Sequence, residues 1–497
     1  MQIKFKKNLI KKFQHPLFRN SFFGSSGFIF ISLIGLIITP ILVANFGVEQ
    51  YGVYVLIISI VGYYGIFDFG LGQGLIKFIS EYNSKGLYQK LNEAINSVFT
   101  VQLIIGVVLS SIVFIFAEKI INILNVSSLY YCDSVDALKI ASIGFLFTIL
   151  SSTFSSAIKG LERYGIITVI DSSFNLLLNI LILIVVFFKY GIKEAVLVNV
   201  IVSFANLLVY AFLFKNHNKY YVFRIGYNSK IIKNFISFSV FIFLSRISSI
   251  FSKYVVRFIV SVMLGPTAVT YYVVPSKLTG AIGGVLSSAA NAIYPFTSRL
   301  KAIGKVNEIK DAFIKASKIF TAISLPLALF IILFSKSILT IWMGEGFAEK
   351  SWIVLSIISL SGIIGSFSTL PNFTLLGLGN SKLIGLFSGI TIILYLIFIP
   401  ILTMKFGIIG TASGLLITSI SVITLVLYKT TKVIDINVLN FFFIVYKNHL
   451  LPISFILLLV IPSFLLIKMT YIEKLIIGII VIVIYYAYLL KKNILNF

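Results

Sequence analysis

FISFSVFIFLSRISSIFSKYVVRFIVSVML, residues 235–264, is long and apolar enough to cross a membrane, yet it carries three permanent cations. They are Arg246, Lys253 and Arg257, and the second and third follow the first by seven and eleven residues. At about 100° per residue, both later side chains fall within about 20° of Arg246 around a regular α-helix. A cation at the centre of a bilayer costs about 2.5–3.5 kcal/mol on the mildest scale. The shared cationic face therefore predicts a water-filled cavity that attracts an anion.

The alternative is that these side chains bury only their stems and reach the membrane surface with their charges. Arg257 lies about two helical turns from Gly265 and could do this in part. Arg246 lies about 16 Å from Phe235 at ~1.5 Å per residue, which is too deep for such an escape. Because guanidinium groups form forked hydrogen bonds with phosphate oxygens, we expect the cavity to suit a phosphate group in particular.

Composition places the whole chain in the membrane class. Of its 497 residues, 59% are hydrophobic and only 11% are charged, about half the charged share of a soluble domain. The net charge of +25 does not indicate a nucleic-acid partner, because most of the cations lie between the apolar segments. The single cysteine, Cys132, excludes an intramolecular disulfide, and no metal-ligand spacing is present, so we expect neither a metal nor a catalytic cofactor.

The apolar segments predict an all-α polytopic membrane protein with 14 transmembrane helices. Continuous apolar runs, rather than ten-residue alternations, exclude a β-barrel. The predicted spans are Ser21–Ala44, Tyr51–Leu71, Ala94–Ala117, Ala137–Ala157, Tyr164–Phe188, Ala195–Phe214, Phe235–Leu264, Val273–Phe296, Phe313–Ser335, Trp352–Leu376, Leu383–Met404, Ile408–Tyr428, Leu450–Ile467 and Leu475–Leu490.

The loop cations predict the orientation of these spans. With the N-terminus inside, the cytoplasmic segments hold 28 of the 41 Lys and Arg residues, and the outside segments hold nine. This excess predicts that both termini are cytoplasmic. Residues 1–20 alternate lysines with large apolar residues, which favours a basic amphipathic arm on the membrane surface, although a solvated arm fits equally.

The chain also repeats itself at an offset of about 217 residues. Gly160-Leu161 falls on Gly377-Leu378, and Tyr190-Gly191-Ile192 falls on Phe406-Gly407-Ile408. We therefore predict two six-helix lobes, residues 21–214 and 235–428, joined by a cytoplasmic linker at 215–234. Because six spans restore the starting orientation, the lobes should form a parallel repeat about a pseudo-two-fold axis along the membrane normal. Residues 429–497 add a linker and two extra helices.

The two lobes differ in their intramembrane charges. The second lobe carries the cationic face and Lys277, which is either a further ligand of the anion or an interfacial anchor. The first lobe carries Asp68 and Asp171 inside its predicted spans. Such a carboxylate can couple transport to an H⁺ or Na⁺ gradient. Asp68 precedes Gly70 and Gly72, so its alternative role is to organise a helix terminus. Asp171 can instead pair with a cation of the other lobe.

Several stretches resemble one family of membrane proteins. They are FGVEQYGVYVLIIS (Phe46–Ser59), FDFGLGQGLIKFISEY (Phe67–Tyr82), GLERYGIITVIDSSFNLLLNI (Gly160–Ile180) and GLGNSKLIG (Gly377–Gly385). In their order and spacing, these stretches resemble Wzx-type O-antigen and capsule flippases of the polysaccharide biosynthesis and export family. That family belongs to the superfamily of multidrug, oligosaccharidyl-lipid and polysaccharide exporters.

The resemblance implies a flippase in the bacterial inner membrane that moves undecaprenyl-pyrophosphate-linked oligosaccharide repeat units to the outer leaflet. The charges inside the predicted spans indicate that Arg246, Lys253 and Arg257 contact the pyrophosphate, with Lys277 as a weaker candidate. Asp171 and Asp68 are the candidates for ion coupling. The expected partners are the polyprenyl-linked glycan and membrane lipid, with the polysaccharide polymerase machinery as a further candidate. The alternatives are a multidrug cation exporter and a lipid II-type flippase. We expect no enzyme, because no phosphate loop or nucleophile–base pair is visible.

Overall fold

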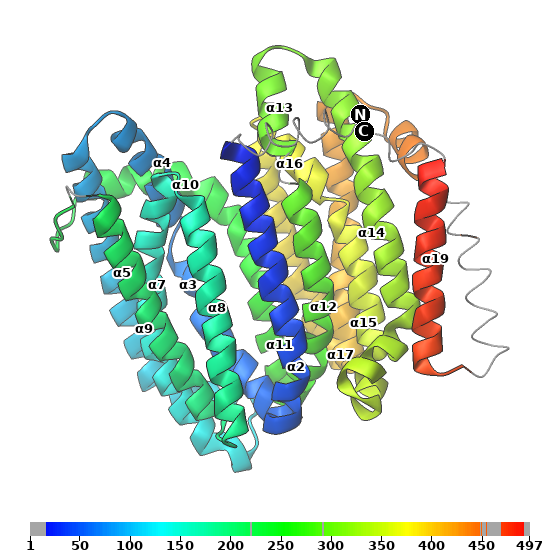
Figure 1. The fold of residues 1–497 in the computed structure, drawn as a ribbon, viewed down its shortest axis with the longest axis horizontal. Coiled ribbons are helices and arrows are strands. Elements are labelled where there is room, and N and C mark those ends of the chain that lie inside the picture. The colour runs from blue at the N-terminus through cyan, green and yellow to red at the C-terminus, as the bar shows by residue number, and fades with distance from the viewer. Residues whose placement is uncertain are drawn as a thin grey trace, which may run out of the picture. The chain divides into compact units, whose positions relative to one another are not determined.

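The computed structural model describes residues 16–218, 221–290, 293–447, 449, 454 and 469–491. Every regular element within these ranges is a helix (Figure 1). Nine of the described helical segments are long and apolar enough to cross a membrane. A helix satisfies its backbone hydrogen bonds within itself, so such segments are stable in lipid. The chain is therefore an integral membrane protein with an all-helical fold.

The chain divides into two compact units, Met1–Thr270 and Tyr271–Phe497. The helices of the first unit are α2 (Pro16–Gly62), α3 (Tyr64–Phe67), α4 (Leu71–Ser84), α5 (Tyr88–Ile115), α6 (Ala117–Ile123), the 3₁₀ turn η1 (Ser128–Tyr130), α7 (Tyr131–Gly160), α8 (Tyr164–Phe187), α9 (Ile192–His217), α10 (Ser229–Ile250), the π-helical turn η2 (Phe251–Val255) and α11 (Val256–Leu264). The second unit contains most of α12 (Pro266–Ala290), then α13 (Ile293–Ala302), α14 (Val306–Met343), α15 (Glu345–Ser366), α16 (Thr369–Gly377), α17 (Ser381–Val433) and α19 (Tyr471–Lys491).

Two helices are too long for one crossing and are bent at a glycine. α2 has 47 residues and α17 has 53, whereas about 20 residues cross a bilayer. Gly47 in α2 has a φ of 78°, and Gly407 in α17 has a φ of 59°. A residue with a Cβ rarely adopts such angles, so glycine makes each bend inexpensive. α2 thus covers the first predicted span and the start of the second, which continues into α3, and α17 covers the eleventh and twelfth.

Other predicted spans differ from the helices that form. The seventh span is not one regular α-helix, because the π-helical turn η2 interrupts it between α10 and α11. The seventh span includes side chains outside the described part of the structure, and neither it nor the eighth span is among the nine described candidates for crossing. The thirteenth span, Leu450–Ile467, lies outside the described residues except for position 454, and most of the N-terminal arm also lies outside them.

Unusual backbone angles recur at the repeat offset. Residues with positive φ form four pairs that are 217 or 218 positions apart: Gly47 with Gly265, Gly86 with Gly304, Glu162 with Gly379, and Lys189 with Gly407. Positive φ is uncommon outside turns, so four matched pairs indicate that equivalent turns were duplicated. This recurrence supports the predicted repeat, while the arrangement of two lobes stays a prediction.

The turn at Gly47 contacts its matched turn at Gly265 within the first unit. Thr270 Oγ1 donates a hydrogen bond of 2.6 Å to the carbonyl oxygen of Val48. A Cβ added at Gly52 would lie 2.0 Å from the carbonyl oxygen of Pro266. Residues 48 and 266, and likewise 52 and 270, are 218 positions apart. The contact is therefore reciprocal, as expected for two equivalent turns that meet about a two-fold axis.

Helix α7 is the centre of the first unit. It packs against α5 and α9 on its sides and also contacts α2 and α4 (Figure 1). A buried cluster that includes Leu75, Ile95, Phe154 and Phe214 joins α4, α5, α7 and α9. Phe235 at the start of α10 belongs to the same cluster and stacks on Phe78 with a ring separation of 4.6 Å. The predicted first span of the second repeat therefore packs within the first unit.

The segment between α9 and α10 is held against α5. Asn96 Nδ2 donates a hydrogen bond of 2.9 Å to the carbonyl oxygen of Val222, and the Tyr221 hydroxyl donates one of 3.1 Å to Asn96 Oδ1. Further along, Gly226 N donates to Thr100 Oγ1 at 3.1 Å. Burial raises the pKa of the Tyr221 phenol, consistent with a docked segment. Residues 221–228, which form the described part of the predicted linker between α9 and α10, are thus an extended strap on α5.

The second unit is built on α14, α15 and α17, with α19 packed along α14 (Figure 1). Gly478 of α19 lies directly against Phe330 and Phe334 of α14, and a Cβ at this position would lie 2.5 Å from the Phe330 ring. Tyr485, Leu489 and Phe334 are fully or almost fully buried in the same contact. The last described helix is therefore an integral part of this unit.

Candidate functional site

One face of α7 is lined with polar side chains although the helix is long enough to cross a membrane. Hydroxyl side chains recur every three or four residues along it, and the row ends at Lys159. This spacing places them on a single helical face. The hydroxyl-bearing residues of this row are Thr148, Ser151, Ser152, Ser155 and Ser156.

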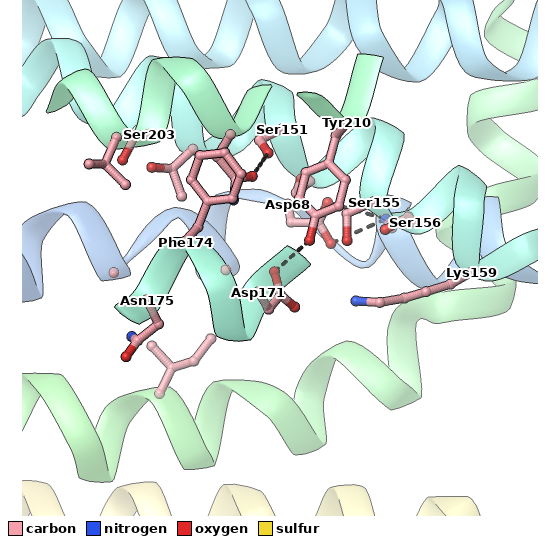
Figure 2. A pocket seen from close by; sticks show the side chains of 18 of the residues that line it. Asp68, Ser151, Ser155, Ser156, Lys159, Asp171, Phe174, Asn175, Ser203 and Tyr210 are labelled. Carbon is pink, nitrogen blue, oxygen red and sulfur yellow. Dashed lines mark hydrogen bonds between the residues drawn. The ribbon is translucent and has the colours of Figure 1, made fainter. Parts of the chain in front are cut away.

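This face borders a cavity of about 970 Å³ that lies entirely within the first unit (Figure 2). The other walls come from α3 and α4, α8, α9 and the end of α10 with η2. Asn175 and Phe174 project from α8, and Ser203, Asn206 and Tyr210 project from α9. Amides and hydroxyls can both donate and accept hydrogen bonds, so this lining suits a ligand rich in hydroxyl groups.

Asp68 lies at the wall of the cavity and is only 5% exposed. Its carboxylate accepts hydrogen bonds from Gly72 N at 3.2 Å and from Gln102 Nε2 at 2.7 Å. Gln102 is held in turn by Thr153 of α7. Asp68 precedes α4, and a carboxylate beside the first turn of a helix is stabilised by the free N–H groups there. These contacts match the helix-terminus role that was one of two readings of Asp68.

Asp171 occupies a different environment in the same cavity. It is exposed, and it accepts a hydrogen bond from the buried Tyr210 hydroxyl. Figure 2 shows the Lys159 side chain extending from α7 toward the Asp171 carboxylate. The predicted span thus places a carboxylate beside both a phenol and an ammonium group inside a polar cavity. Both predicted roles of Asp171, ion coupling and pairing with a cation of the other lobe, stay predictions.

The π-helical turn separates the cations of the cationic face. A π turn has wider i→i+5 hydrogen bonds than an α-helix, so it shifts the residues that follow around the helix axis. Lys253 is exposed and lines the cavity. Arg257 does not line it. Its Nη1 donates a hydrogen bond of 2.9 Å to Ser59 Oγ, and its guanidinium lies 5.4 Å from the centre of the Tyr254 ring. The regular-helix geometry assumed for the sequence does not hold here.

The two remaining predicted cations cannot be placed at the cavity. The backbone of Arg246 belongs to α10, but its side chain lies outside the described part of the structure. Lys277 belongs to α12 in the second unit, which is described separately from this cavity. Asp68, Asp171 and Lys253 are therefore the predicted site residues that the structure brings together.

Sequence reasoning missed Lys159 and the hydroxyl row of α7. Lys159 was counted among the cytoplasmic loop cations, because the predicted fourth span ended at Ala157. The sequence does indicate the hydroxyl row, because TILSSTFSSAIKG (Thr148–Gly160) repeats polar residues at helical spacing within an apolar segment. Within the described residues, no three His, Cys, Asp or Glu side chains lie together as metal ligands would.

Comparison with known proteins identifies the family. Residues 17–301 match the family described as polysaccharide biosynthesis protein, which is more than half of the chain. The chain belongs to this family. It is 26% identical over 396 residues to a protein of Shigella flexneri described as a candidate O-antigen transporter, a match that covers 80% of this chain and 93% of the relative. It is also 22% identical over 358 residues to an uncharacterised membrane protein of Methanocaldococcus jannaschii, covering 69% of this chain and 70% of that protein.

Solved structures define the fold of this family member. The inward closed conformation of the lipid II flippase MurJ matches with a TM-score of 0.74 and 18% identity, over 95% of this chain and 99% of MurJ. The inward-facing conformation of a multidrug resistance MATE transporter matches with a TM-score of 0.65 and 15% identity, over 84% of this chain and 94% of that one. The chain thus shares the all-helical fold of these two proteins.

Proposed function

We propose that this protein is a flippase for undecaprenyl-pyrophosphate-linked oligosaccharide repeat units in O-antigen or capsule biosynthesis. The observation that carries the proposal is the 970 Å³ polar cavity inside a helical unit of a membrane protein. A pocket of this size suits several sugar rings, since drug-sized ligand sites span roughly 300–1,000 Å³. Membership of the polysaccharide biosynthesis family and the Shigella flexneri relative support the same substrate class.

The lining matches both polar parts of such a substrate. The hydroxyl row of α7 and the amides of Asn175 and Asn206 pair with sugar hydroxyls, which donate and accept in the same way. The ammonium groups of Lys159 and Lys253 supply the positive potential that a pyrophosphate needs away from water. Arg246, Arg257 and Lys277 remain predicted pyrophosphate ligands for another stage of transport, and neither Arg257 nor Lys277 lines the described cavity. A cavity with these lysines is a poor site for the organic cations that a multidrug exporter handles.

The proposed topology has 14 transmembrane helices with both termini in the cytoplasm of a bacterium. Two six-helix lobes, related by the repeat, flank the substrate path, and the last two helices lie outside the repeat. The recurrence of positive-φ residues at the repeat offset supports this duplication. On the outer leaflet, the polysaccharide polymerase machinery is the partner that would consume the flipped unit.

The proposed mechanism is alternating access. The reciprocal contact of Val48 and Gly52 with Pro266 and Thr270 joins equivalent turns of the two repeats. Two lobes that rock about a central cavity must separate such a contact in one of their states. Separation breaks one hydrogen bond, at a cost of about 0.5–1.5 kcal/mol, and one close backbone approach.

Asp171 is the proposed coupling residue. Because Asp171 lines the same cavity as Lys159 and Lys253, binding of a proton there would be linked to binding of the pyrophosphate. The Asp68 carboxylate accepts hydrogen bonds from Gly72 and Gln102, so in this proposal its main role is to hold the start of α4 in place. Coupling to Na⁺ at either carboxylate is the competing form of this mechanism.

The test is complementation of a strain whose surface glycan depends on this protein, with lipid-linked intermediate quantified in parallel. Lys253→Glu should abolish display and cause intermediate to accumulate, because it places a carboxylate beside the pyrophosphate path. Lys253→Arg should retain most display. Lys90→Glu, on an exposed lysine of α5 outside the cavity, is the matched control. Normal display from Lys253→Glu at equal membrane abundance would refute the proposed path. Accumulation of lipid II instead would assign the protein to the lipid II class.

A further inference from the structure

The second unit contains a small recess of about 40 Å³ where α12, α14 and α15 meet. Most of its wall is apolar, from residues such as Ile282, Leu286 and Ile331. Four hydroxyl groups interrupt that wall: Ser324 from α14, Ser359 and Ser366 from α15, and Thr279 from α12. All lie within the second unit, so the recess is separate from the cavity of the first unit.

Two of these hydroxyls lack a hydrogen-bond partner among the described residues. Ser324 is 2% exposed and Ser359 is 3% exposed, and neither Oγ atom is bonded there. A buried hydroxyl without a partner loses its bonds to water and gains nothing in return. Native proteins rarely leave such groups unsatisfied. Two of them in one recess therefore indicate a ligand that accepts hydrogen bonds.

The other two hydroxyls are complementary to these. Thr279 Oγ1 donates to the carbonyl oxygen of Ser276 at 3.2 Å, and Ser366 Oγ donates to that of Ile363 at 2.6 Å. Each of these hydroxyl groups already donates its hydrogen, but its oxygen atom can still accept a hydrogen bond. The recess thus presents two free O–H donors and two acceptor oxygens. A ligand that satisfies all four must both accept and donate.

Glycines keep this space open. A Cβ added at Gly283 of α12 or at Gly362 of α15 would meet no other atom within 4 Å. Both residues line the recess, and each leaves the volume that a methyl group would fill. A water molecule needs about 10–15 Å³ measured in this way. The recess therefore has room for about two or three waters and is far too small for a sugar ring.

We propose that this recess is a permanent hydration site in which ordered waters link α12, α14 and α15. Water is the ligand because it accepts from Ser324 and Ser359 and donates to Thr279 and Ser366. A monovalent cation would use only oxygen lone pairs and would leave both serine O–H groups pointing into apolar surroundings. Waters that join three helices let their side chains exchange partners as the helices shift, which a dry apolar contact does not.

The sign of a stability change tests the proposal. In a dry recess, Ser324→Ala and Ser359→Ala each remove an unsatisfied hydroxyl and should raise the Tm of the purified protein. In a hydrated recess, each removes a bond to water and should lower Tm by about 1–2 °C. Ser351→Ala in α15 is the control, because that buried hydroxyl is bonded to the carbonyl oxygen of Phe347. A rise in Tm above that of the wild type in Ser324→Ala or Ser359→Ala, while Ser351→Ala lowers Tm, would overturn the proposal.

Two further measurements separate water from other outcomes. Gly362→Ala should gain less stability than Gly389→Ala, a helical glycine of α17 that also has no atom within 4 Å, since only the first displaces water. Equal gains would indicate a dry recess. Replacing NaCl with choline chloride should leave the wild-type Tm unchanged. A Na⁺-dependent Tm that disappears in the Ser324→Ala/Ser359→Ala double variant would assign the recess to a cation and refute the water site.

Discussion

Replacing Gly52 with alanine should force the reciprocal contact in the first unit to open. The new Cβ would lie 2.0 Å from the Pro266 carbonyl oxygen and 2.9 Å from Thr270 Oγ1. Because Cβ atoms are not found closer than 3.0 Å to other atoms, the two segments must separate by about 1 Å. The neighbour at the shortest distance is backbone, so no side-chain rotation can relieve the overlap.

The size of the effect follows from two costs. Overpacking costs about 1–3 kcal/mol, and loss of the hydrogen bond from Thr270 to Val48 costs about 0.5–1.5 kcal/mol. Together they disfavour the closed contact by about 2–4 kcal/mol. At about 1.4 kcal/mol per tenfold change, the open state should gain between about 30-fold and 700-fold in relative population. The gain in helix propensity from alanine acts on both states and cancels.

Cysteine labelling measures this shift directly. Val269→Cys places a thiol at a fully buried position beside Thr270, in a Cys132→Ser background because the native cysteine is exposed. Maleimide labelling of this thiol should accelerate strongly in Gly52→Ala. Thr270→Val, which removes only the hydrogen bond, should accelerate it by about 2- to 12-fold. Gly35→Ala in the same helix is the control, since nothing lies within 4 Å of its Cβ position.

Labelling of Gly52→Ala within twofold of the parent, in protein that elutes normally on gel filtration, would refute this reasoning. It would mean that the segments relax around the methyl group without separating.

Two other contacts yield predictions. Asn96→Ala removes both hydrogen bonds that hold the strap at Tyr221 and Val222, so limited trypsin should cleave after the exposed Arg224 several-fold faster than in the wild type. Asn83→Ala is the control, and equal cleavage rates in Asn96→Ala and the wild type would show that the strap is held elsewhere. Gly478→Leu should lower Tm, because overpacking against Phe330 and Phe334 costs about 1–3 kcal/mol, whereas Gly389→Leu should not. An unchanged Tm in Gly478→Leu would mean that α19 does not stabilise the second unit.

The sequence by itself determined the class and the periodicity of this protein. Apolar runs and sparse charge are local properties, so they identified an integral membrane protein without reference to any contact between helices. The repeat was also readable, because a duplication preserves spacing even where residues diverge. The bends at Gly47 and Gly407 fall between adjacent predicted spans, where the apolar pattern breaks. The resemblance placed the chain in the family that the comparisons then identified.

Only the tertiary structure decided which polar groups share a cavity. Lys159 and Lys253 lie 94 positions apart, and which helix faces meet depends on packing that no local pattern records. A π turn interrupts the regular helix between Arg246 and Arg257, so an angle of 100° per residue does not apply through it, and whether the three cations share one face stays a prediction. Asp68 and Asp171 look alike in sequence. The structure separates them, since one carboxylate is bound by the start of α4 and Gln102, while the other stands exposed beside Tyr210.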